Sequence, residues 1–170
     1  MKKILIWGAL AALLLVIAIG LNRSQQGQVS VGQQAPDFTL TSFNGESYHL
    51  ESLRGKVVLV NFWASWCESC KPEAADLENA WRRYQTRDDV IFLGVDYVDT
   101  ERDAKAYLEA FDITYPNGPD KGTKISQAYR VQGVPETFII DKSGQIVHVQ
   151  IGPFHSLSEI TALIDPLLND

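Results

Sequence analysis

Residues 57–70 read Val-Val-Leu-Val-Asn-Phe-Trp-Ala-Ser-Trp-Cys-Glu-Ser-Cys. The run from Val57 to Trp63 is continuously apolar and rich in β-branched and aromatic side chains, as in a strand buried on both faces. A helical pattern follows from about Cys67 to Tyr84. The stretch therefore predicts a central strand that leads directly into a helix, with Cys67 at the start of that helix.

Cys67 and Cys70 are the only cysteines of the chain, so they do not form a scattered disulfide framework. At a helix N-terminus, unpaired backbone N–H groups and the helix dipole favour a thiolate at Cys67. Cys70 lies one turn further, close enough to form a disulfide with Cys67 and expected to be more buried. This spacing suits thiol–disulfide exchange, in which Cys67 attacks and Cys70 resolves the mixed disulfide.

Metal binding is the alternative use of two such cysteines. Zinc needs four ligands, and His49, His148 and His155 do not stand at the usual spacing for a zinc site. Copper(I) held by the two thiolates is a more serious alternative, although the only methionine is the first residue. We therefore expect no metal site and no cofactor beyond the Cys67–Cys70 pair.

The remaining pattern predicts an α/β domain with a mixed central sheet. Further strands are expected at residues 90–95, 137–140 and 145–151, and helices at 100–111, 121–129 and 156–168. A hairpin around Asn44-Gly45 precedes the central strand. Because strands alternate with helices, both faces of the sheet should be covered, and the short turn at 141–144 makes the last two strands antiparallel. Asp96, Asp99 and Asp103 are expected to form a solvated acidic turn.

The N-terminus predicts export of this domain. Lys2 and Lys3 precede an apolar run from Ile4 to Leu21, which as a helix would be about 27 Å long, close to the ~30 Å core of a bilayer. We predict a transmembrane anchor over residues 1–21 with the N-terminus inside, a cleaved signal peptide being the alternative. Residues 22–34 are predicted to be a flexible linker and 35–170 the folded domain. The formal net charge of −6, without a basic stripe, argues against nucleic-acid binding.

The Trp-Cys-x-x-Cys-Lys motif after a hydrophobic strand resembles the thioredoxin superfamily. The opening Pro36-Asp37-Phe38, the segment 96–116 and the stretch 133–138 are similar to the membrane-anchored TlpA, ResA and CcmG (DsbE) branch. The resemblance implies a three-layer α/β/α sandwich with an N-terminal β extension and, at 96–116, a helical insertion. It covers residues 35–168.

The resemblance also implies roles for single residues. Cys67 would be the attacking thiol and Cys70 the resolving one. Pro135 would face them in cis, and Val134 would pair with an extended substrate. Other residues expected to support the site are Trp66, which shapes the surface beside Cys67, and Glu68, Glu73 and Glu136, three carboxylates near the thiols. Asn61 replaces the buried aspartate of ordinary thioredoxin, so proton relay would fall to another group such as Glu73.

The implied function is reduction of disulfides outside the cytoplasm, in apocytochrome c or a partner that handles it. Electrons would come from a membrane protein of the CcdA/DsbD type. The alternatives are a general disulfide oxidase or isomerase, and a copper(I)-delivery module. A thiol peroxidase is disfavoured, because Ala64 stands where peroxiredoxins have a threonine, three residues before the attacking cysteine.

Overall fold

The computed structural model describes residues 13, 15 and 29–168. Within these residues no helix is long and apolar enough to cross a membrane, and most of the predicted anchor lies outside them. The elements, in chain order, are β1 (Thr39–Thr41), β2 (Ser47–His49), η1 (Leu50–Leu53), β3 (Val57–Trp63), η2 (Glu68–Cys70), α2 (Lys71–Tyr84), β4 (Val90–Asp96), α3 (Glu101–Ala110), β5 (Asn117–Pro119), η3 (Lys121–Thr123), α4 (Lys124–Tyr129), β6 (Glu136–Ile140), β7 (Ile146–Ile151), α5 (Leu157–Ile164) and η4 (Asp165–Leu168).

The central sheet has five strands in the order β5-β4-β3-β6-β7. Strands β3, β4 and β5 are parallel, whereas β6 is antiparallel to both β3 and β7. The predicted mixed sheet is therefore confirmed. The predicted hairpin is also present as the pair β1–β2, which forms a small sheet of its own.

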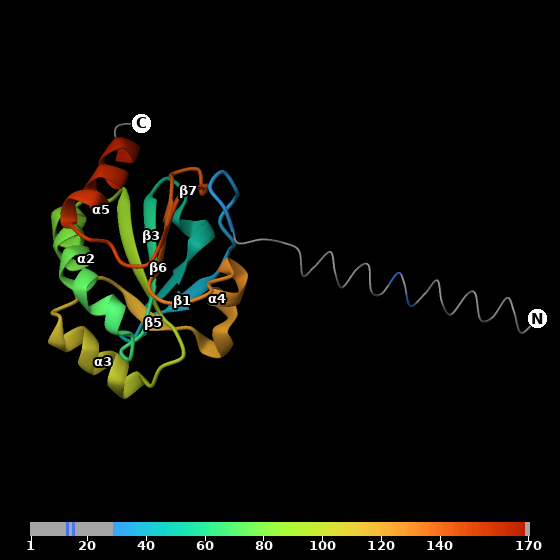
Figure 1. Cartoon of the computed structure of the whole chain (residues 1–170). Helices are drawn as coiled ribbons and strands as arrows, with labels where there is room; N and C mark the ends of the chain where they lie inside the picture. The colour runs from blue at the N-terminus through green and yellow to red at the C-terminus, as the bar shows by residue number, and fades with distance from the viewer. Residues whose placement is uncertain (1–12, 14, 16–28, 169–170) are drawn as a thin grey trace, which may run out of the picture.

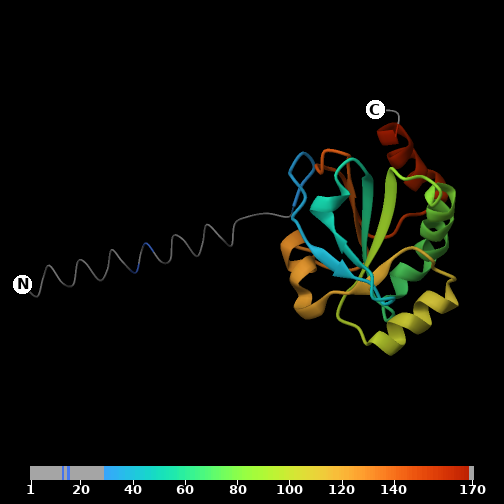
Figure 2. The same ribbon diagram turned by 180° about the vertical axis from the view of Figure 1, so that it is seen from behind.

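Helices cover both faces of this sheet, as Figures 1 and 2 show from opposite sides. Side chains of β3 alternate between the two faces, and all seven residues of the strand are buried. Val58, Val60 and Phe62 pack with the N-terminal hairpin and α4. Val57 and Leu59 pack with α2 and α5 on the opposite face. The result is the predicted α/β/α sandwich.

Packing of the domain begins earlier than the predicted boundary at Ala35. Val29 is buried, Gly32 N–H donates to the Ile146 carbonyl at 2.8 Å, and Ile146 N–H donates to the Gln33 carbonyl at 2.9 Å. Residues 29–34 therefore lie against the start of β7, to which their backbone is hydrogen-bonded. The predicted flexible linker does not extend through them.

The predicted helical insertion at residues 96–116 contains α3 as expected, and directly after it comes a strand that the sequence pattern missed. β5 has only three residues, Asn-Gly-Pro, which rarely form strands. It pairs with the last residues of β4 at the sheet edge. The pairing buries Asn117, whose side chain then contacts the region behind the cysteines.

Candidate active site

Cys67 and Cys70 lie where β3 passes into α2, as predicted, and they form a disulfide. Their Cα atoms are 5.4 Å apart. Cys67 is the N-cap of η2, and its sulfur accepts a hydrogen bond from the Cys70 N–H at 3.1 Å. An N–H that points at the sulfur stabilises a thiolate once the disulfide is reduced. Both cysteines are largely buried, with Cys67 4% and Cys70 1% exposed, so only an edge of the disulfide is accessible.

The loop before β6 lies against Cys67. The Val134–Pro135 peptide bond is cis, as the resemblance implied. The Val134 carbonyl oxygen is 3.5 Å from the Cys67 sulfur. A groove of about 260 Å³ runs beside this loop, and its lining includes Ser69, Pro135, Glu136 and Ile151. The groove could hold an extended segment of a substrate next to the disulfide.

Glu73 and Glu136 are both buried, each 1% exposed, but they lie in different surroundings. Glu136 lines the groove and accepts a hydrogen bond from the Gln132 N–H at 3.4 Å. Glu73 lies on α2, behind the disulfide. Its Oε1 accepts from Asn61 Nδ2 at 3.1 Å and its Oε2 accepts from the Phe154 N–H at 2.9 Å.

Burial raises the pKa of Glu73 to about 7, although its hydrogen bonds from Phe154 and Asn61 act in the opposite direction. Glu73 and Cys70 line the same internal cavity, of about 10 Å³, which is close to the room that one water molecule needs. A carboxyl group that titrates near neutral pH, next to the resolving cysteine, can take up and return a proton during exchange.

The insertion helix α3 completes the back of the site, a role that no sequence pattern indicates. The Tyr107 ring stacks on Trp63 with centroids 4.7 Å apart, and its hydroxyl donates to the Cys70 carbonyl at 3.2 Å. Trp63 Nε1 donates to Asn117 Oδ1 at 2.8 Å. These contacts fix Trp63 as a core residue beneath the cysteine loop.

Trp66 and Glu68 are the exposed members of the predicted site. Trp66 is 56% exposed, and its Nε1 donates to the Val98 carbonyl at 3.0 Å. The Glu68 side chain is 83% exposed and pairs with Lys71 at 2.6 Å. Trp66 can therefore contact a substrate, whereas Glu68 points into solvent and contributes surface charge.

The predicted solvated turn of Asp96, Asp99 and Asp103 is wrong for Asp96, which is only 2% exposed. Asp96 is the last residue of β4 and lies in register with Trp63 of β3. At this position the neighbouring strands and loops cover Asp96. Asp96 therefore lies close to the end of β3, from which the cysteine loop begins.

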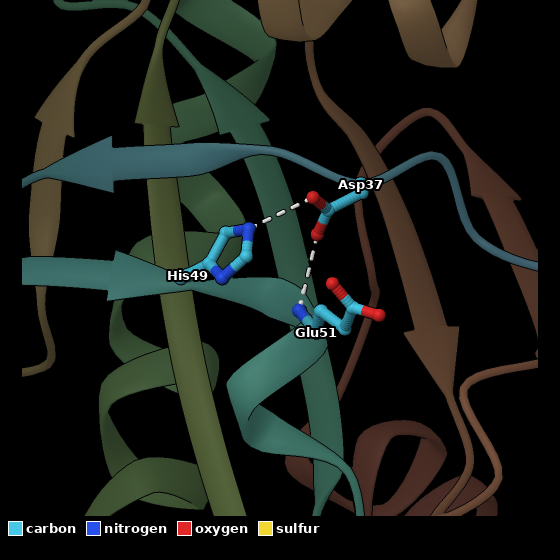
Figure 3. A group of neighbouring side chains, drawn as sticks. All are labelled: Asp37, His49 and Glu51. Atoms are coloured by element: carbon cyan, nitrogen blue, oxygen red, sulfur yellow. Dashed lines mark hydrogen bonds and ion pairs between the residues drawn. The ribbon is translucent and has the colours of Figure 1, made fainter.

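Figure 3 shows a second group of polar side chains, near the N-terminal hairpin. Asp37, His49 and Glu51 place potential metal-binding atoms within 4.8 Å of one another. Asp37 Oδ2 is 2.8 Å from His49 Nε2, and Asp37 Oδ1 accepts from the Glu51 N–H at 3.1 Å. Asp37 thus connects the segment before β1 to β2 and to the start of η1, and these two contacts explain why the three side chains lie together.

The sequence family follows from comparison with known proteins. A model of the AhpC/TSA family matches residues 31–149. The chain belongs to the AhpC/TSA family. It is 32% identical over 156 residues to the thiol-disulfide oxidoreductase ResA of a Bacillus cereus strain, covering 89% of this chain and 90% of that protein. It is also 32% identical over 154 residues to the thioredoxin-like protein YneN of Bacillus subtilis, covering 84% and 89%.

Solved structures agree with this assignment. A putative protein disulfide isomerase from Bacteroides thetaiotaomicron superposes with a TM-score of 0.77 at 32% identity, covering 84% of this chain and 92% of that chain. A putative thiol:disulfide interchange protein DsbE from Chlorobium tepidum gives 0.71 at 26% identity, covering 83% and 97%. This member of the AhpC/TSA family is a thiol–disulfide oxidoreductase of thioredoxin fold, with Cys67–Cys70 as its redox disulfide.

Proposed function

We propose that the protein is an extracytoplasmic reductase that reduces the disulfide of apocytochrome c, or of a protein that handles it, for haem attachment. The observation that carries this proposal is the buried Glu73 behind Cys70. A nearby carboxylate raises the pKa of a thiol and so disfavours the thiolate. Strong oxidants such as DsbA depend on a stabilised reduced form. Glu73 disfavours a stabilised thiolate in the reduced form. It therefore favours a low reduction potential for the Cys67–Cys70 pair, as a reductase requires.

The reaction follows from the geometry in two steps. The Cys67 thiolate attacks one sulfur of the substrate disulfide, that S–S bond breaks, and the second substrate sulfur leaves and takes up a proton. Cys70 then gives its proton to Glu73 and attacks the Cys67 sulfur of the mixed disulfide. The mixed S–S bond breaks, and the substrate sulfur leaves as a thiolate that takes up the proton returned by Glu73 or one from solvent. The substrate is then a dithiol with two electrons gained, and the Cys67–Cys70 disulfide remains, which is the state of the present structure.

The protein must then be reduced again. In an oxidising compartment, a membrane dithiol protein of the CcdA/DsbD type would supply the two electrons. The apolar run at residues 1–21 would keep the domain close to such a donor as a single-pass anchor. Protease treatment of cells tests this topology. We expect the domain to be degraded once the layers outside the cell membrane have been removed while that membrane is still intact. A domain that stays protected by the intact cell membrane would contradict the proposed topology.

The peroxidase activity suggested by the family name fits the site less well. Ala64 offers no hydroxyl three residues before Cys67, and it is fully buried. Cys67 is also bonded to a cysteine only one turn away rather than to a distant resolving cysteine. Both features favour exchange with protein disulfides.

The experiment that tests the proposal uses the reduced full chain and two oxidised substrates. One is a peptide with an intramolecular Cys-x-x-Cys-His disulfide, and the other is insulin. We expect faster reduction of the peptide than of insulin, with both reactions lost in Cys67→Ser. Failure to reduce the peptide, together with oxidation of the dithiol peptide by the disulfide form, would identify an oxidase instead.

A further inference from the structure

Large apolar side chains are exposed around the disulfide. Among residues 29–168, the exposed ones are those of Val31, Trp66, Val98 and Ile151. Val31 lies at the start of β7, where the neighbouring Gly32 N–H donates to the Ile146 carbonyl. The other three lie at the opposite end of the sheet, where the cysteine loop begins. Scattered exposed apolar side chains are ordinary on a soluble domain, whereas a group of them at a reactive disulfide marks a surface for a partner.

The order of the strands places these side chains on both sides of Cys67. In the order β5-β4-β3-β6-β7, the cysteine loop follows β3, and Val98 follows β4, the parallel neighbour of β3 on one side. Strand β6 is antiparallel to both β3 and β7, so the last residue of β7, Ile151, lies at the same end of the sheet on the other side. A substrate disulfide that reaches Cys67 therefore has Val98 on one side and Ile151 on the other.

Hydrogen bonds hold both sides in place next to the cysteine pair. Trp66 Nε1 donates to the Val98 carbonyl at 3.0 Å, which keeps Val98 beside the residue that precedes the first cysteine. On the other side, the glycine after Ile151 donates its N–H to the Pro135 carbonyl at 3.0 Å. Ile151 and Pro135 also line the same groove of about 260 Å³. The exposed side chains are therefore continuous with the surface that a substrate contacts during exchange.

Val98 is an unusual residue for its position. Its φ angle is +47°, in the left-handed region that glycine and asparagine adopt readily and that β-branched residues rarely adopt. Its side chain is 58% exposed, so burial within the domain does little to offset the strain. The hydrogen bond from Trp66 uses the backbone carbonyl, which any residue would offer. Since strained residues are concentrated at functional sites, the valine side chain is best explained by contact with a partner.

We propose that Val98 and Ile151 determine specificity by selecting protein disulfides whose cysteine is flanked by apolar side chains. An extended substrate segment that reaches Cys67 places one apolar side chain against Val98 and Trp66 and another against Ile151. Burial of these side chains stabilises the complex in which exchange occurs, whereas a polar flank would lose water without gaining a hydrogen-bond partner. The inference rests on exchange at Cys67 alone and holds for either direction of electron flow.

Reduction of matched peptides by the reduced full chain tests this selectivity. Each peptide has a single cysteine and is used as its disulfide-linked dimer, so that the two sulfurs are equivalent. The peptides differ only beside the cysteine: one has serine on both sides, one has leucine on the N-terminal side, and one has leucine on the C-terminal side. We expect each leucine to raise kcat/KM roughly 3- to 10-fold over the serine peptide. Equal values for the three peptides would overturn the proposal.

Val98→Asn and Ile151→Thr remove the two apolar contacts one at a time. Each variant should lose the preference for leucine on one side of the cysteine and keep the preference on the other side. Val98→Ile retains an apolar side chain and should keep both preferences. Val31→Thr is the matched control, because Val31 is an exposed valine at the other end of β7, and it should also keep both. Preferences that survive in both Val98→Asn and Ile151→Thr, or that disappear in Val31→Thr, would contradict the proposal.

Stability measurements separate substrate contact from a structural role of Val98. Asparagine tolerates the left-handed conformation better than valine, so Val98→Asn should unfold at the same or a higher denaturant concentration while its preference for leucine falls. A loss of stability in parallel with the loss of preference would indicate a disturbed loop and overturn the proposal. If the protein proves to be an oxidase, its disulfide form should show the same preference with the peptides as thiols. The selectivity and the proposed direction of electron flow can therefore fail separately.

Discussion

Asn61 of β3 donates a hydrogen bond to Glu73 of α2 at 3.1 Å, across the interface between the sheet and the helix that carries the cysteines. The same Asn61 amide donates to Thr137 Oγ1 of β6 at 2.9 Å. Asn61 thus holds the Glu73 carboxyl group in place without offering a titrating group itself. This arrangement leaves Glu73 as a buried proton acceptor that lines the same cavity as Cys70.

Replacement of Glu73 by glutamine should reduce the pH dependence of stability. The pKa of Glu73 is raised from 4.5 to about 7, so the folded protein binds this proton more tightly than the unfolded chain. The resulting stabilisation is complete below about pH 4.5 and is lost as pH rises through about 7; it amounts to about 3 kcal/mol. Denaturant unfolding of the oxidised protein at about pH 5 and about pH 8 measures this difference. An unchanged difference in Glu73→Gln would show that the carboxyl group is not the cause.

Asn61→Asp should destabilise the protein more at pH 8 than at pH 5. The variant places a second carboxyl group beside Glu73, and two adjacent buried carboxylates cannot both ionise without a large penalty. We expect a loss of about 2–4 kcal/mol in the free energy of unfolding at pH 8 and a smaller loss at pH 5, where both groups are protonated. Asn61→Ala is the control, because it removes the same hydrogen bonds without adding a charge. Equal losses for the aspartate variant at both pH values would argue against this explanation.

Replacement of Cys67 and replacement of Cys70 should differ in whether a mixed disulfide with the substrate accumulates. Cys70→Ser retains the attacking sulfur, so it should accumulate a mixed disulfide with the substrate, visible by mass spectrometry under non-reducing conditions. Cys67→Ser should form none, since Cys70 is nearly inaccessible at 1% exposure. Turnover should fall at least ~10³-fold in both variants. Equal trapping by the two variants would contradict the assignment of Cys67 as the attacking thiol.

Trp66→Ala should impair exchange with protein substrates while leaving the fold intact. Trp66 is 56% exposed, and removing it should change the free energy of unfolding by less than about 1 kcal/mol. We expect kcat/KM for a protein disulfide to fall by roughly 10-fold, because aromatic anchors at a binding surface carry much of the affinity. The rate with a small disulfide should change far less, and Trp66→Phe should recover part of the lost activity. Equal losses with both substrates would point to a disturbed cysteine loop.

Much of the fold could be predicted from the sequence because its signals are local. The apolar run at 57–63 and the helical pattern after Cys67 both appear in the structure as β3 and α2, with the 3-10 turn η2 between them. The helix predicted at 156–168 is present as α5 and η4, and the Ser156 hydroxyl caps its first turn by accepting the Glu159 N–H at 3.3 Å. Each of these elements depends on residues close together in the chain.

Features that depend on distant partners could not be predicted. Strand β5 forms only because the end of β4 lies beside it. Asp96 looked like part of an exposed turn, yet the register of β4 with β3 places it next to Trp63 and buries it. For Glu73, the sequence indicates a place near the thiols but not the groups that hold its carboxyl group. The second hydrogen bond to its carboxyl group comes from the Phe154 backbone, and no side-chain pattern reveals such a donor.

The reduction potential of the Cys67–Cys70 pair in the full chain tests the proposed direction of electron flow most directly. Equilibration with dithiol buffers of known potential gives this value from the fraction of disulfide. We expect a potential below about −230 mV, towards the ~−270 mV of thioredoxin, as a reductase requires. A potential near the ~−120 mV of DsbA would contradict it and identify the protein as a disulfide donor.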